Sequence, residues 1–151
     1  MKIFEHLMQL KDWVDQEPLT SDWHAISQTQ IDQFAQATGD HQWIHVDPEK
    51  AKAGPFGTPI AHGFLTLSMV PLFFQTAFSI SDVRMGVNYG LNRVRFTSPV
   101  PVNSRLRGNF VLKSCEEIDN QGLQLTWRVH VEREGSDKVV CIAETVTRLY
   151  A

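Results

Sequence analysis

The chain has 151 residues, of which 42% are hydrophobic and 21% charged, and its formal net charge is −3. This length indicates a single domain over residues 1–151, large enough to bury an apolar core without disulfides or metal. The slight negative charge argues against a nucleic-acid partner, which would require a clustered basic face. It leaves room for a small phosphorylated ligand held by a few arginines.

The cysteines and the N-terminus indicate a cellular compartment. Cys115 and Cys141 lie far apart, in stretches that resemble strands, and are expected to be reduced core thiols. A cytoplasmic location fits this best. Charged residues interrupt the first six positions, so we expect no signal peptide, and no apolar run is long enough to imply a membrane span or a membrane partner.

The N-terminal third has helical signals separated by breaks. Apolar side chains recur at helical spacing in the first dozen residues, which predicts a short amphipathic helix there. These are Ile3, Leu7, Leu10 and Val14. Residues 23–26 are expected to be briefly extended. Ser27 and Gln30 form a capping-box pattern, which predicts a helix that Gly39 ends.

The next stretch combines a short helix with a loop. Asp47 followed by Pro48 is typical of a helix start, and Gly54 is expected to end that short helix. The glycines and prolines of residues 54–59 exclude regular structure.

Residues 63–78 carry apolar side chains on every side of a helical wheel, which predicts a long central helix buried all round. Pro71 lies inside this run and is expected to bend the helix.

The remainder of the chain predicts four long strands. Alternation beginning at Val87 shifts phase around residues 92–93, which suggests a bulge. Residues 119–122 predict a hairpin turn, and residues 123–131 alternate most clearly of all. A last strand is expected from Val139 to Tyr150. The sequence therefore predicts an α+β fold, in which a curved antiparallel sheet wraps around the central helix.

Residues 39–68 contain the candidate catalytic residues. Asp40 and His45 lie five residues apart in an expected irregular loop, close enough for both to bind one water. Carboxylate and neutral imidazole form a common acid–base pair near neutral pH. The alternative is that Asp40 caps local backbone and His45 packs beside Trp43.

Gly63 begins the predicted central helix. Its N–H is not shielded by a Cβ and is suited to stabilising a developing oxyanion, although a tight turn would also explain the glycine. His62 is a candidate acid–base group, substrate contact or cap, and we favour a structural or supporting role. His41, His45, Asp47 and His62 match no strong zinc spacing, so no metal is expected.

Two further groups of residues are candidates for chemistry or binding. Ser27 and Ser68 lack the setting of a nucleophile elbow. An arginine cluster before and within the first long strands is suited to phosphate contacts or is simply exposed. It comprises Arg84, Arg93, Arg95, Arg105 and Arg107.

The run A-T-G-D-H-Q-W-I-H-V-D-P, followed by F-G-T-P-I-A-H-G-F, resembles the signature of MaoC-like dehydratases, the (R)-specific enoyl-CoA hydratases, and especially their nodulation-protein-N-like branch. N-Y-G-L-N-R-V-R-F-T-S-P-V-P-V in residues 88–102 also resembles that branch. The family usually has Asp-x-Asn-Pro-x-His at the active site, whereas Gln42 and Trp43 replace Asn-Pro here.

The resemblance implies a single hot-dog fold that works as a homodimer, without cofactor or metal. Asp40 and His45 match the catalytic pair and Gly63 matches the backbone oxyanion donor. The implied partner is an acyl thioester of coenzyme A or acyl carrier protein. His62, Trp43 and Phe64 are the candidate substrate contacts, the last two by narrowing an acyl tunnel.

The implied reaction is addition of water to a trans-2-enoyl thioester, giving an (R)-3-hydroxyacyl thioester. Two alternatives remain at this point. A hot-dog thioesterase would hydrolyse the acyl–sulfur bond instead, and a non-catalytic module would only bind the acyl thioester.

Overall fold

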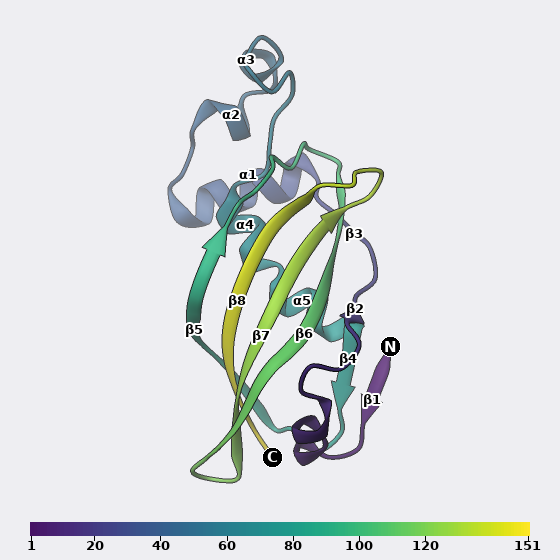
Figure 1. Cartoon of the computed structure of the whole chain (residues 1–151). Coiled ribbons are helices and arrows are strands. Elements are labelled where there is room, and N and C mark those ends of the chain that lie inside the picture. The colour runs from purple at the N-terminus through teal and green to yellow at the C-terminus, as the bar shows by residue number, and fades with distance from the viewer.

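The computed structural model describes residues 1–151. A curved antiparallel sheet wraps around a central helical segment, as predicted (Figure 1). Its four long strands are β5 (Met85–Arg95), β6 (Arg105–Ile118), β7 (Gly122–Arg133) and β8 (Val139–Tyr150). With the short strand β2 (Leu19–Thr20) included, the sheet order is β2-β6-β7-β8-β5, so β5 forms one edge.

The sheet follows the predicted alternation. Every second residue of β7 from Leu123 to Val131 is buried against the central segment. The β6–β7 turn places Asn120 and Gln121 at positive φ, in the region where the predicted hairpin turn lies. The pairing of β5 with β8 shifts register between Leu91 and Arg93, which confirms the predicted bulge.

The central segment is two helices rather than one. α4 (Gly63–Ser68) and α5 (Val70–Ala77) are divided at Met69, and Pro71 is the second residue of α5. A proline has no N–H to donate, so it is best accommodated in the first turn of a helix, and the long helix breaks just before it. The prediction that the central segment is buried on every side is also wrong for the single chain, because Phe64 and Leu72 are exposed.

The buried side of the central segment faces the sheet. It comprises Leu65, Met69, Val70, Phe73 and Ala77. Beside it, the ring of Phe74 stacks on that of Phe110 at 4.2 Å between centroids. This packing fixes α4 and α5 relative to the strands, and thereby fixes the residues that lead into α4.

The predicted N-terminal helix is only partly present. β1 (Lys2–Phe4) pairs in parallel with β4 (Phe78–Ile80), which directly follows α5, and a 3₁₀ helix (Leu7–Trp13) comes next. Leu7 and Leu10, three residues apart, are both buried, a spacing that suits a 3₁₀ helix. For Lys2–Phe4 a strand partner distant in sequence overrides the local helical pattern.

Two short strands and one helix precede the site. β2 (Leu19–Thr20) and β3 (His24–Ala25) pair with β6. The predicted helix is present as α1 (Gln28–Thr38). Ser27 Oγ accepts a hydrogen bond from Gln30 N at 3.2 Å, and Gly39, at φ 83°, ends the helix by donating to Ala35 O.

Beyond α1 the chain leaves the sheet and forms two small helices at one end of the molecule (Figure 1). α3 (Pro48–Lys52) starts as predicted, because Asp47 Oδ1 accepts from Lys50 N at 3.0 Å. The preceding residues were expected to be an irregular loop but form α2 (Trp43–Val46). A single turn of four residues is too short for apolar periodicity to reveal.

The remaining expectations concern the cysteines and the membrane. Both cysteines are unpaired, and burial raises the pKa of the Cys141 thiol to about 11, as expected for an inert core residue. None of the helices has the length and apolar character needed to cross a bilayer.

Candidate active site

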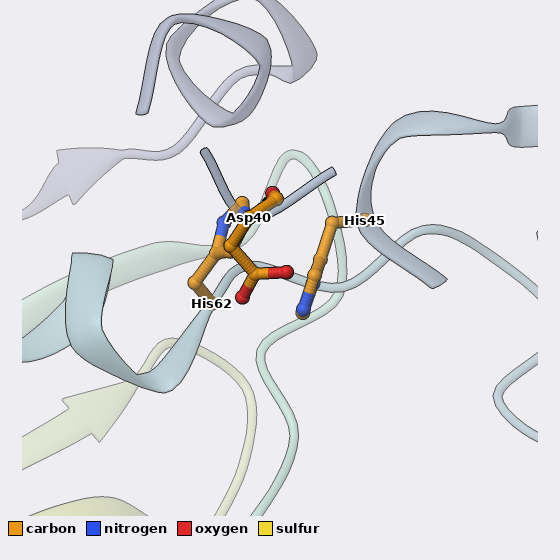
Figure 2. A group of neighbouring side chains, drawn as sticks. All are labelled: Asp40, His45 and His62. Atoms are coloured by element: carbon orange, nitrogen blue, oxygen red, sulfur yellow. Dashed lines mark hydrogen bonds between the residues drawn. The ribbon is translucent and has the colours of Figure 1, made fainter. Parts of the chain in front are cut away.

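Three side chains from three segments meet at the end of the central helix. Asp40 follows α1, His45 lies on α2, and His62 precedes the first residue of α4. A carboxylate oxygen of Asp40 and one ring nitrogen of each histidine all lie within 4.8 Å of one another. Figure 2 shows the Asp40 carboxylate and the two imidazole rings grouped in this way. The predicted Asp40–His45 pair is therefore brought together.

The turn after α1 sets the direction of Asp40. Because Gly39 adopts the left-handed conformation, the chain reverses there and presents the next side chain to the site. Gln42 N donates to Asp40 Oδ1 at 3.3 Å, which restrains the carboxylate near α2. The Asp40 side chain is exposed and accessible to water.

His45 is held in one tautomer. Its Nδ1 lies 2.6 Å from Ile60 O, and since a carbonyl only accepts, Nδ1 carries the proton and Nε2 is free to accept one. Burial, which leaves 7% of the residue exposed, lowers the pKa of His45; nearby His62 acts in the same direction, while the Ile60 carbonyl and Asp40 oppose it. His45 is therefore a neutral imidazole at pH 7, with Nε2 as the basic atom.

His62 links the other two residues. Its Nε2 donates to the backbone oxygen of Asp40 at 3.0 Å, and its ring stacks on that of His45 at 3.8 Å. Phe34 packs on His62 at 4.9 Å, and only 3% of the residue is exposed. These contacts hold the Asp40 turn against α2, which matches the supporting role favoured from sequence more closely than direct contact with substrate.

The same three side chains fit a metal ion poorly. The imidazoles stack with 22° between their planes, so their in-plane lone pairs run side by side instead of converging on one point. His41 and Asp47, which were weighed as ligands from sequence, are not part of the cluster. The arrangement favours proton transfer over metal binding.

A cavity of about 320 Å³ adjoins His45. Gly63 lies on its wall, and its N–H donates no hydrogen bond within the chain. The ring of Phe96 lies against Gly63 so closely that a Cβ there would be 2.6 Å from the ring. Any side chain at this position would displace the Phe96 ring, and the free N–H of Gly63 is available next to the imidazole.

The structure places Trp43 and Phe64 outside the wall of this cavity. The Trp43 ring packs on Gly54, where an added Cβ would lie 2.7 Å away, and the Lys50 ammonium lies 4.9 Å from the ring centroid. Phe64 is 68% exposed and touches Phe96 edge-on at 5.8 Å.

Thr66 and Phe96 are among the cavity-wall residues that sequence reasoning missed. Phe96 comes directly after β5, just past the bulge that the alternation revealed. Thr66 gave no signal, because it stands among apolar residues in the α4 pattern.

The remaining candidates have structural contacts. Ser27 caps α1, and Ser68 Oγ donates to Phe64 O at 2.7 Å, so neither is set up as a nucleophile. Arg105 and Arg107 pair with Glu134 and Glu132, each at 2.9 Å. Two arginines of the cluster are thus engaged in ion pairs on the surface of the sheet.

The fold and this cluster define a class of protein: a hot-dog protein with a carboxylate and a neutral imidazole beside a free backbone amide. Residues 10–134 match the family described as MaoC like domain. The chain belongs to the MaoC-like dehydratase family and is a hydro-lyase.

Three known proteins illustrate the relationship. The chain is 47% identical over 151 residues to 3-hydroxyacyl-thioester dehydratase Z of Mycobacterium tuberculosis (strain ATCC 25618 / H37Rv), covering 100% of both. It is 47% identical to Nodulation protein N of Rhizobium leguminosarum bv. viciae, covering 89% of this chain and 84% of that protein. The solved R-hydratase PhaJ1 from Pseudomonas aeruginosa shares the fold, with a TM-score of 0.67, 22% identity, and coverage of 89% and 79%. The resemblance to the nodulation-protein-N-like branch is confirmed.

Proposed function

We propose that the protein is an (R)-specific enoyl-thioester hydratase, and in reverse a 3-hydroxyacyl-thioester dehydratase. The observation that carries the proposal is the meeting of Asp40 and the neutral His45 beside a cavity whose wall includes Gly63. The name of the M. tuberculosis relative, which is 47% identical over its whole length, supports a 3-hydroxyacyl thioester as substrate. The carrier is coenzyme A or acyl carrier protein.

Catalysis begins with polarisation of the substrate. The thioester carbonyl of a trans-2-enoyl group draws electron density through the double bond and makes C3 electrophilic. The Gly63 N–H donates to the carbonyl oxygen as it gains enolate charge. The loss of one such donor typically raises a barrier by about 3–4 kcal/mol.

Asp40 and His45 then act on one water. They hold it between them, remove a proton as it attacks C3, and return a proton to C2 on the same face. His45 Nε2 is the free nitrogen, and Asp40 is the exposed carboxylate that can orient the water. His62 keeps the two groups at a fixed separation.

The test replaces each acid–base group with a polar amide side chain that does not exchange protons near neutral pH. Asp40→Asn and His45→Gln are each expected to reduce crotonyl-CoA hydration by at least about a hundredfold, the usual worth of a positioned acid–base group. Hydration is followed by loss of absorbance at the enoyl band, and chiral analysis identifies the 3-hydroxyacyl product.

Folding and oligomeric state of both variants are the controls, since each is expected to remain a folded dimer. Near-normal turnover in both variants would show that Asp40 and His45 do not have the proposed catalytic roles. Release of free thiol, followed with a thiol-reactive dye, would identify a thioesterase, and saturable binding without absorbance loss would identify a binding module.

A further inference from the structure

Three buried polar side-chain atoms have no hydrogen-bond partner: His62 Nδ1, Thr66 Oγ1 and Thr145 Oγ1. Buried hydroxyl groups are nearly always hydrogen-bonded, so each of these requires an explanation. Thr66 differs from Thr145 in its position. It is 1% exposed and lies on the wall of the same cavity as His45 and Gly63.

The helix does not satisfy the Thr66 hydroxyl. A threonine in a helix commonly donates to the carbonyl four residues earlier. Here His62 O already accepts from Leu65 N at 3.0 Å and from Thr66 N at 3.2 Å. The hydroxyl makes no bond to this oxygen and keeps its proton available.

Thr66 and Gly63 share one face of α4. Residues three apart in a helix lie on the same side, and each side chain leans toward the N-terminus of the helix, so Thr66 leans toward Gly63. Both residues line the cavity. Threonine populates two χ1 rotamers in helices, so its hydroxyl can turn toward a ligand atom without backbone movement.

We propose that the Thr66 hydroxyl donates a second hydrogen bond to the thioester carbonyl oxygen, beside the Gly63 N–H. This assignment rests on the proposed hydratase function. The hydroxyl keeps its proton throughout the reaction, and its bond strengthens as negative charge collects on the oxygen. Thr66 is then a catalytic residue, and the substrate supplies the partner that the free protein lacks.

The decisive variant is Thr66→Val, which replaces the hydroxyl with a methyl group of similar size. We expect kcat for crotonyl-CoA hydration to fall on the order of 10²-fold, as for other oxyanion donors, with a much smaller change in KM. Thr66→Ser keeps the hydroxyl and is expected to stay within about threefold of the wild type, since the transition-state bond is retained.

Thr145→Val is the matched control. Thr145 has the same buried, unpaired hydroxyl but lies away from this cavity, so its loss is expected to leave turnover unchanged. The melting temperature of each variant is measured as well. That of Thr66→Val is expected to be no lower than that of the wild type, because no hydrogen bond within the chain is lost. If Thr66→Val fails to fold, Thr66→Ala is compared with the wild type instead.

A spectroscopic measurement separates direct contact from an indirect effect through His62. The carbonyl stretch of bound butyryl-CoA, labelled with ¹³C at the thioester carbon, is expected to move toward its solution frequency in Thr66→Val. An unchanged stretch, or turnover within twofold of the wild type, would overturn the role of Thr66 and leave the hydratase function intact. A wild-type protein that hydrates no enoyl-CoA would overturn both.

Discussion

At the scale of single residues, the site depends on one hydrogen bond to His45. The 2.6 Å contact from Nδ1 to Ile60 O fixes the tautomer, and burial keeps the ring neutral. Together they leave Nε2 as an acceptor at pH 7. Neither determinant is visible in the spacing of Asp40 and His45, since Ile60 follows His45 by fifteen positions.

This setting predicts the acid limb of the pH–rate profile. Burial lowers the pKa of His45 from the model-peptide value of 6.5, so the basic form persists below that pH. We expect kcat/KM to fall on acidification with an apparent pKa below 6.5. An acid limb centred above 6.5 would contradict a buried, neutral His45 as the base.

The same shift affects stability with a definite sign. A histidine with a depressed folded-state pKa stabilises the protein fully above its unfolded-state pKa, and this contribution is lost as pH falls toward the folded-state pKa. The melting temperature should therefore fall below pH 6.5. His45→Gln should weaken that dependence, and the part that remains is expected from His130, whose pKa burial also lowers.

At the scale of elements, Trp43 joins α2 to α3 and to the turn that follows α3. Its ring packs on Gly54, so the position of α2, which carries His45, depends in part on this contact. From its bulk, Trp43 is a candidate for narrowing an acyl tunnel. The structure instead places it between two turns of backbone.

Trp43→Ala is expected to lower the free energy of unfolding by about 2 kcal/mol, less than for a fully buried tryptophan because the residue is half-buried. Denaturant melts measure this change. Lys50→Ala removes only the cation–π contact and is expected to cost about 0.5–1 kcal/mol.

Trp43→Ala also tests whether Trp43 contacts the substrate. A panel of trans-2-enoyl-CoA substrates of rising length is expected to show the same preference in Trp43→Ala as in the wild type. A shift of the preference toward longer acyl chains would show that Trp43 does limit the acyl site.

At the scale of the whole molecule, one side of the chain is incompletely covered. β5 is an edge strand paired only with β8, and nearly all its residues are exposed, among them Met85, Val87, Tyr89 and Leu91. Long exposed apolar edges promote association with another chain. We propose that a second copy of this chain pairs there, in agreement with the homodimer that the family resemblance implies.

The double variant Val87→Lys/Leu91→Lys is expected to shift the protein from dimer to monomer, because lysine blocks strand pairing at an edge. Analytical ultracentrifugation measures this shift. The matched control is Met8→Lys, since Met8 is an equally exposed apolar residue that lies outside β5. A dimer that persists in the double variant would place the interface elsewhere.

The sequence by itself determined the long strands, the bulge in β5 and the pair of acid–base residues. Alternation, turn residues and capping patterns are local, and they act within a few positions of one another. Asp40 and His45 lie in a single short stretch, so their proximity was also predictable. The family signature in the same stretch indicated the hot-dog fold.

Tertiary structure alone decided the rest. The N-terminal residues became a strand because β4, more than seventy positions away, offers a partner. His62 joins the site because it stacks on His45, and Thr66 because α4 turns it toward the cavity. These outcomes depend on contacts between segments far apart in the chain, and no local pattern encodes such contacts.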